Sequence, residues 1–194
     1  MTPTPRVVEA GVRSFACAYE RYVEDPFRLG QFVAVREGPC VVLGVVTDSA
    51  SGPEDPSRPL QPRGTADQSA ADVMSDNPEI RLLLRTRVSV VSCGHIEGET
   101  ARPTLPPMPP PLLARVEPAS EAETVRLASD AAFLALLVGA PGCDDAAIAA
   151  AVRSAAEAFG DGAHEFRVRA GKELARLLRA EPARLTSIMR GIGV

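Results

Sequence analysis

Hydrophobic residues alternate with polar ones in the first half of the chain and recur at helical spacing in the second half. The clearest alternating stretch is residues 30–48, in which two runs rich in β-branched and aromatic residues flank an Arg-Glu-Gly-Pro sequence at 36–39. This composition predicts a β-hairpin with a short turn. Gly30 and Gly44 interrupt the strand pattern, which is typical of the bulges and bends that small barrels use at their corners.

Two further stretches have the period of two that strands show. Residues 6–22 predict a single strand that ends before Pro26. Residues 80–93 predict the longest strand, with one apolar face. Its other face carries Arg81, Arg85 and Arg87. This row is either the solvated face of a barrel strand, kept from edge aggregation by charge, or a strip that binds phosphates or carboxylates of a partner.

Two segments lack any core pattern. Residues 48–78 are crowded with Ser, Pro, Asp, Gly and Gln, and predict a long exposed loop. One helical turn near residues 67–74 is compatible with its composition. Such a loop is either a contact element or a disordered insertion. Residues 102–111 contain six prolines and predict an extended spacer, with docking onto an SH3-like module as the alternative.

After the proline-rich segment the apolar spacing becomes helical. Ser120 and Glu123 form a capping-box sequence that predicts a helix running to Gly139. Further helices are predicted from Asp144 or Asp145 to Gly160, over residues 163–180, and from Pro182 onward. Their outer faces carry a basic set consisting of Arg167, Arg169, Lys172, Arg176, Arg179, Arg184 and Arg190.

The change of period sets the predicted fold class. We expect an α+β protein in which residues 1–118 form a small β-barrel with a long loop and a proline-rich exit. Residues 119–194 are expected to form a small helical domain. Hydrophobic residues make up 45% of the 194 positions, which is enough for a core.

Net charge and cysteine content indicate which partners and which cellular compartment to expect. A net charge of -4 argues against a nucleic-acid-coating protein but leaves room for a local basic strip. The four cysteines lack metal-ligand spacing and predict buried free thiols in a reducing cytoplasm. We also expect no secretion signal, no membrane segment and a cytoplasmic location.

Little in the sequence points to catalysis. Cys93 and His95 lie two positions apart without a second ligand pair, and His164 stands alone. Asp144 and Asp145 are explained by a helix cap. We therefore expect a protein that is not an enzyme, with no catalytic residue, metal or cofactor.

The order of the predicted parts resembles the HAS-barrel family, the N-terminal barrel of HerA-type DNA translocases and, in related form, of rotary ATP synthase subunits. A Gly-x-Phe-Val strand at 30–33 and a Leu-Gly-x-Val strand at 43–46 come first. A variable insertion at 48–78, a long strand at 80–93 and a proline-rich exit follow in the family's order. The resemblance covers residues 6–118.

The resemblance implies a role without ATP hydrolysis. In full-length relatives the barrel precedes a RecA-like motor, helps to hold a ring together and meets a nuclease partner, whereas no Walker motif follows here. It implies a non-enzymatic adaptor or oligomerisation protein of HerA-like DNA-processing or DNA-repair machinery, with a motor ATPase or nuclease as possible partner and DNA contacted only indirectly or weakly. Arg81, Arg85 and Arg87 are then the candidate partner-binding residues.

Self-association is a further expectation. Strand edges of a small barrel, and apolar residues such as Leu83 and Val91 on the arginine face, favour a homo-oligomer. Two alternatives stay open. One is a nucleic-acid-binding protein that uses the basic set of the C-terminal helices, and the other is an enzyme or small-ligand barrel of unrecognised type.

Overall fold

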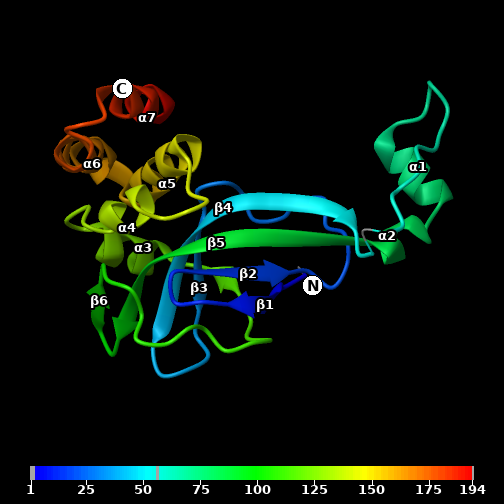
Figure 1. Ribbon diagram of the computed structural model, residues 1–194, viewed down its shortest axis with the longest axis horizontal. Coiled ribbons are helices and arrows are strands. Elements are labelled where there is room, and N and C mark those ends of the chain that lie inside the picture. Colours follow the sequence, from blue (N-terminus) through cyan, green and yellow to red (C-terminus); the bar gives the residue numbers. More distant parts are fainter. Residues whose placement is uncertain (1–2, 56, 194) are drawn as a thin grey trace.

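The computed structural model describes residues 3–55 and 57–193. Within them the chain is a mixed α/β structure built on a seven-stranded antiparallel sheet, with α3 to α7 gathered at one end and α1 and α2 at the other (Figure 1). The strands are β1 (Arg6–Ala10), β2 (Ser14–Ala18), β3 (Phe32–Val35), β4 (Val41–Pro53), β5 (Leu84–Glu97), β6 (Thr100–Arg102) and β7 (Glu117–Pro118). The helices are α1 (Ala70–Asp76), α2 (Ile80–Leu83), α3 (Glu121–Ala128), α4 (Leu134–Val138), α5 (Asp145–Ala158), a 3₁₀ turn (Gly160–Gly162), α6 (Ala163–Leu177) and α7 (Pro182–Ile192).

The sheet runs in the order β1-β2-β5-β4-β3-β7, with β6 paired to β5. β7 pairs with β3, and the residues just before β7 lie beside β1 at the other end of this path. Val7 donates its N–H to Ala114 O over 2.9 Å, and Leu113 donates to Val7 O over 2.8 Å. Val116 donates to Pro5 O over 3.0 Å. The segment of residues 113–118 therefore contains the last strand of the path, β7, and also bonds to the chain at its first strand, β1.

One face of the sheet packs an apolar cluster, which we call the interior cluster. Because side chains alternate along a strand, β3 directs Val33 and Val35 into this cluster and Phe32 and Ala34 to the opposite face. The interior cluster consists of Val7, Phe15, Cys17, Tyr19, Val33, Val35, Cys40, Val42, Val46, Val88, Val90, Ala114 and Val116. Its members come from all the long strands and from the segment before β7.

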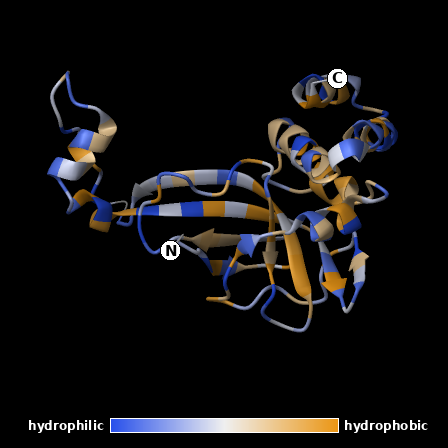
Figure 2. Ribbon diagram, turned by 180° about the vertical axis from the view of Figure 1, so that it is seen from behind, coloured by the Kyte–Doolittle hydropathy of each residue, from blue (hydrophilic) through white to orange (hydrophobic). Residues whose placement is uncertain are grey.

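Helices α3 to α7 cover the opposite face of β3, β4 and β5 at one end of the sheet. We call this contact between sheet and helices the junction. Phe32 meets Phe133 edge to face with ring centroids 5.6 Å apart. Gly30 has a left-handed φ of +78°, and a Cβ there would lie 2.3 Å from the backbone of Ala150 in α5. The strands at this junction are almost continuously hydrophobic in Figure 2, since both of their faces are buried. The junction places residues from either side of position 118 in one apolar cluster.

The predicted hairpin of residues 30–48 is confirmed as β3 and β4, and a register shift lies at Gly44 as the pattern indicated. The prediction of one strand over residues 6–22 is wrong, because β1 and β2 form an antiparallel hairpin that turns at residues 11–13. Gly11 carried the missed signal. Its Cα hydrogens lie so close to Ser14 O that an added Cβ would stand 2.7 Å from that oxygen.

The long strand begins later and ends later than the pattern predicted. Residues 80–83 form α2, which places Arg81 on a helix, and β5 continues to Glu97 before turning into β6. The loop prediction for residues 48–78 is wrong at its start, since β4 extends to Pro53, whereas the helical turn expected near residues 67–74 is found as α1 at 70–76. We call the described residues of 47–87 the arm, which comprises the outer parts of β4 and β5 with α1 and α2 and projects away from α3 to α7 (Figure 1).

In the helical part, the capping box of Ser120 and Glu123 is confirmed, and Asp144 caps α5 through the N–H of Ala147 at 2.7 Å. The single predicted helix from Ser120 to Gly139 is wrong, because the chain breaks into α3 and α4 around Ala131, whose φ is +61°. The proline-rich segment packs along the sheet rather than standing free. His95 in β5 holds it, with its Nδ1–H 3.1 Å from Thr104 O.

Candidate functional site

The arginine row predicted from the sequence lies on the arm and at its base. Arg85 and Arg87 stand on the solvent side of β5, and Arg81 follows on α2, each with its side chain 39–50% exposed. Every one of them forms an ion pair inside the chain: Arg81 with Glu24 at 3.0 Å, Arg85 with Glu54, and Arg87 with Glu9. The row is thus a mixed-charge surface. A carboxylate of a partner would have to share an arginine with its glutamate or displace that glutamate. Either change costs little free energy, because exposed ion pairs contribute little to stability.

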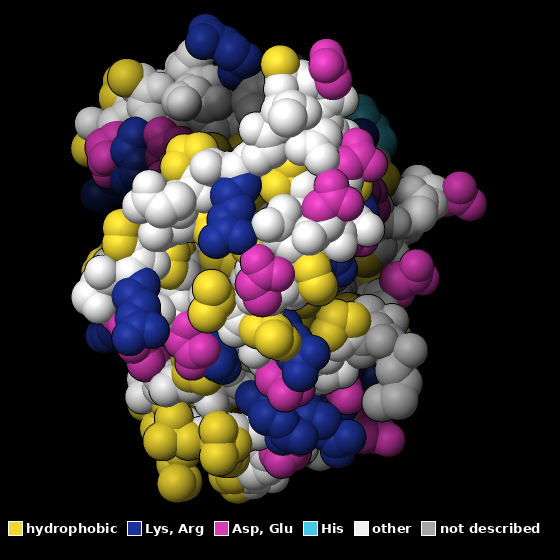
Figure 3. Space-filling view, turned by 90° about the vertical axis from the view of Figure 1, so that its right-hand side faces the viewer, with side chains coloured by type: hydrophobic (Ala, Val, Ile, Leu, Met, Phe, Trp, Pro, Cys, Tyr) yellow, Lys and Arg dark blue, Asp and Glu magenta, His cyan; other side chains and the backbone are white. Residues whose placement is uncertain are grey.

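Charges of both signs are interleaved around this row. Figure 3, which views the molecule from the side of the arm, shows Lys and Arg side chains between Asp and Glu side chains rather than gathered by sign. Exposed apolar residues accompany them on the arm: Leu60 is 47%, Leu82 58% and Leu83 56% exposed. Both Leu83 and Val91 were expected to be exposed. The expectation is confirmed for Leu83 and wrong for Val91, which is 3% exposed because the C-terminal helices cover β5 at that point.

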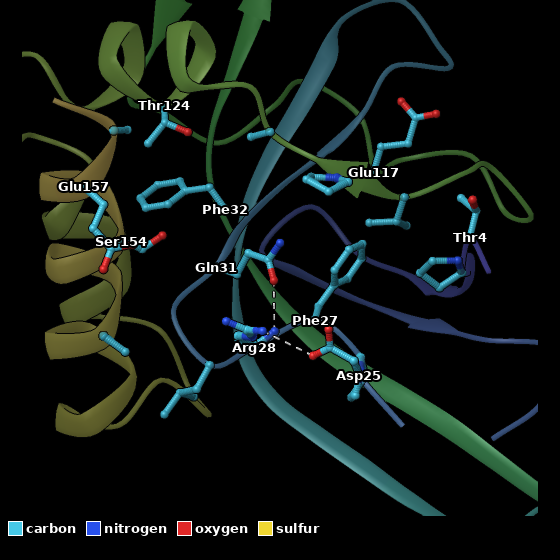
Figure 4. Close-up of a pocket in the computed structure, with 18 of the residues that line it drawn as sticks. Thr4, Asp25, Phe27, Arg28, Gln31, Phe32, Glu117, Thr124, Ser154 and Glu157 are labelled. Carbon is cyan, nitrogen blue, oxygen red and sulfur yellow. Dashed lines mark hydrogen bonds and ion pairs between the residues drawn. The ribbon is translucent and has the colours of Figure 1, made fainter. Parts of the chain in front are cut away.

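A cleft of about 890 Å³ opens between the chain entering β3, the segment around β7, and α5 (Figure 4). Phe27 and Phe32 line its floor, and its walls carry both acidic and basic side chains. Arg28 donates its backbone N–H to Gln31 Oε1 over 3.0 Å and approaches Asp25 at 3.5 Å. No cysteine or histidine occurs among the described residues that line it. The cleft can hold a polar ligand or a peptide segment, and sequence reasoning did not find it because its walls come from four separated segments.

Arg36 links the sheet to the helices beside this cleft. It donates to Glu117 in β7 over 2.6 Å and to Glu123 in α3 over 2.7 Å. Burial opposes ionisation of Glu123, but the backbone N–H of Ser120 and the Arg36 guanidinium outweigh it and hold the pKa of this carboxyl below its ordinary value. The capping box and the ion pair therefore act on the same carboxylate.

The seven basic residues of the C-terminal helices divide into two groups. Arg169 pairs with Glu165 and lies 5.7 Å over the Phe159 ring, while Arg176 pairs with Glu173. Arg184 pairs with both Asp145 and Glu181, at 2.8 and 3.3 Å. The second group forms no ion pair with any described residue and consists of Arg167, Lys172 and Arg179 on α6 and after it, and Arg190 in the last turn of α7. About half of the predicted basic surface is thus neutralised by the chain's own carboxylates.

The thiols and histidines do not assemble into a nucleophile. All four cysteines are free and buried, as the sequence predicted. Burial raises the pKa of Cys17 to about 12 and that of Cys143 to about 11, so both are protonated at neutral pH. Across residues 3–55 and 57–193, no group of three His, Cys, Asp or Glu side chains could hold a metal ion.

An apolar tip beside the proline-rich segment was also missed. Met108, Leu112 and Leu113 are 58–65% exposed, and Leu113 has a left-handed φ of +65°. Arg6 holds this conformation by donating to Leu113 O over 2.7 Å. A bulky residue in that region is strained, and the Pro-Pro-Leu-Leu sequence gives no local signal for it.

Comparison with protein-family models finds no match, and comparison with curated protein sequences finds none either. In the part of the chain that the structure describes, no helix is both long and apolar enough to cross a membrane.

Proposed function

We propose that this chain is a non-catalytic adaptor of HerA-like DNA-processing machinery, built on a closed barrel of the HAS type. The observation that carries the proposal is the segment 113–118. It pairs with β3 through β7 and with β1 through the bonds of Val7, so the sheet path has a common neighbour at both ends. This contact between the two ends of the path supports a closed barrel, since closure removes the free outer strands of a sheet.

The interior cluster supports the same assignment. Ala114 and Val116 join the apolar cluster formed by the strands, as closing-strand residues of a small barrel do. The Gly-x-Phe-Val and Leu-Gly-x-Val sequences occupy the paired strands β3 and β4, in the order that the resemblance requires. Helices α3 to α7 stand where a HerA-type protein continues into its motor, and they cap the barrel's outer face instead.

The partner surface in this proposal is the arm with the arginine row. The arm presents exposed leucines and half-exposed arginines together. Apolar residues ringed by charges are typical of protein interaction sites rather than of a solvated face. The partner is a HerA-type motor ATPase or a nuclease with an acidic docking face.

The test is a binding measurement against a HerA-type motor ATPase and against a nuclease from the same genome. The variant Arg81→Glu/Arg85→Glu/Arg87→Glu is expected to abolish binding in calorimetric titration, because three charge pairs become repulsive. A matched control with the same change in charge is Arg167→Glu/Lys172→Glu/Arg179→Glu, which should bind as the unmodified protein does. Circular dichroism melts establish that both variants are folded. Binding unaffected by the first triple change would return the arginine row to a solvated face.

Direct DNA binding is the second candidate, favoured by the lack of ion pairs at Arg167, Lys172 and Arg179 among the described residues. Fluorescence anisotropy with a labelled duplex over a salt series tests it. The adaptor proposal expects weak binding that the helix triple variant leaves unchanged. Tight, steeply salt-dependent binding that this variant abolishes would establish the nucleic-acid-binding alternative instead.

A further inference from the structure

Strand β4 extends beyond the end of its neighbour β3, so one edge of β4 in the arm is unpaired. β3 pairs with β4 only as far as Val45, whereas β5 accompanies β4 to Pro53. Asp48, Ser49, Ala50 and Ser51 are exposed along this edge. Among the described residues, no backbone hydrogen bond from another segment reaches this edge beyond Val46. An unpaired, exposed strand edge of this kind is a template for another strand.

The register shows which backbone groups face outward. Ser92 donates to Arg13 O and Thr86 accepts from Tyr19 N, so the even-numbered residues of β5 turn their backbone groups away from β4. In an antiparallel ladder, paired residues turn both their N–H and C=O groups toward each other or both away. Ser51 pairs with Thr86, and Ser49 pairs with Val88. Ser49 and Ser51 therefore present their N–H and C=O groups on the open edge.

This arrangement is self-complementary about Ala50. When two such edges meet antiparallel on a two-fold axis at Ala50, Ser49 of one copy faces Ser51 of the other and all four outward groups on each side find partners. The residues around the axis are small, and only Asp48 is charged. Pro53, which has no N–H to donate, ends the pairing. We propose that the open β4 edge is a homodimer interface, in which a second copy of this chain adds its own β4 across a two-fold axis at Ala50.

Charge complementarity favours a second copy over an unrelated strand. Asp48, Ala50 and Gly52 share one face with Arg85 and Arg87, since Gly52 pairs with Arg85 and Ala50 with Arg87. In the proposed pairing Asp48 lies opposite Gly52 of the second copy, and Arg85 of that copy is the next residue across, on β5. The backbones of Asp48 and this Arg85 are then two strand spacings, about 10 Å, apart. A Cβ at Gly52 would meet nothing within 4 Å, so the space between the two charged groups is open.

Both charged groups have bonding capacity left. Asp48 forms no ion pair with any described residue. The Arg85 side chain is 39% exposed, and its guanidinium is paired with one carboxylate, that of Glu54, through Nη2. A guanidinium can hold two carboxylates at once through its fork. Two-fold symmetry forms the Asp48–Arg85 pair twice. Because the contact is short and partly polar, we expect a dissociation constant on the order of 10–100 µM.

This inference deepens the self-association expected from the sequence and does not require the adaptor role, and disulfide trapping tests the interface separately from the oligomer. Residues on the axis form a pair without hydrogen bonds, in which Cα atoms lie about 4.5 Å apart, within the range that a disulfide spans. Because the four native cysteines are buried, an introduced surface thiol reacts alone. Ala50→Cys is expected to convert more than about half of the protein into a covalent dimer on mild oxidation. The matched control Asp48→Cys, on the same edge but away from the axis, should give little.

Equal trapping by the two cysteine variants, or none by Ala50→Cys, overturns this interface. If light scattering still shows a dimer or larger assembly in that case, the oligomerisation role stands and uses another surface. A protein that is trapped at Ala50 but binds no motor or nuclease would retain the interface and reject the adaptor role.

A charge exchange provides the second measurement. Sedimentation equilibrium should show that Asp48→Arg weakens the dimer about tenfold, since it places a positive group opposite Arg85 of the other copy. Arg85→Glu should weaken it similarly. The double variant Asp48→Arg/Arg85→Glu restores the attraction and should return the dissociation constant to within about threefold of the unmodified protein. Additive weakening in the double variant would contradict the proposed register.

Discussion

The junction between the sheet and the helices and the arm are both built on β4 and β5, yet they differ in almost every physical respect. At the junction the two strands are buried on both faces, and Phe32, Phe133 and their neighbours form one apolar cluster. In the arm the same strands have exposed residues on their outer face, and α1 has no buried residue among its seven. The fold's stability therefore resides at the junction, and the arm is available for contacts with other molecules.

The comparison also separates two uses of arginine. Arg36 at the junction ties β3, β7 and α3 together through Glu117 and Glu123. Arg85 and Arg87 on the arm make single pairs with glutamates that are themselves more than half exposed. Exposed single pairs contribute little to stability, so the arm arginines can change partners without unfolding the protein.

Leucine truncation should show the largest contrast between the two regions. Leu127 is 1% exposed and touches the Gly94 position of β5, so Leu127→Ala removes buried contacts and leaves a cavity. We expect a loss of about 3 kcal/mol in the free energy of unfolding, measured by urea denaturation. Leu83→Ala on the arm makes the same chemical change at a 56% exposed site, and should cost less than about 0.5 kcal/mol. Similar losses would show that the arm belongs to the core.

The close approach of Gly30 to α5 should give the next largest effect. Gly30→Ala combines a left-handed φ with a Cβ 2.3 Å from the Ala150 backbone, and should destabilise by about 2 to 3 kcal/mol. Gly98→Ala is the control, because Gly98 also has a positive φ but open space around it. It should cost only about 1 kcal/mol in the same urea titration. Equal costs would mean that the helices move away from the sheet easily.

The ionisation of Glu123 should give the smallest effect. Because its pKa is lowered in the folded state, the stability it contributes is present above its ordinary value of 4.5 and is lost as pH falls through the lower folded value. Glu123→Gln should therefore cost about 1 kcal/mol at pH 7 and progressively less as the pH falls below 4, as measured by thermal melts. Glu121→Gln, in the same turn of α3, should show no such pH dependence. A cost for Glu123→Gln that is the same at every pH would assign the effect to the cap geometry alone.

Local signals in the sequence located much of the junction but little of the arm. The hairpin of β3 and β4, the cap at Ser120 and the apolar stripe of α5 follow from residues near one another in the chain. The candidate site was found in part, since the sequence identified Arg85 and Arg87 as outward-facing. It could not show that Glu54 and Glu9 lie beside them, because ion pairs across strands depend on register.

The sequence by itself determined the change from strand to helix near residue 118, the alternation along β3 and β5, and the burial of the cysteines. These properties depend on the side-chain period of a single segment. Only the tertiary structure decided that residues 113–118 lie between β1 and β3, that Leu113 is held left-handed by Arg6, and that β4 has an open edge. Each of these depends on which distant segments pair. Strand pairing is set by hydrogen bonds and packing across the fold, which no local pattern of residues specifies.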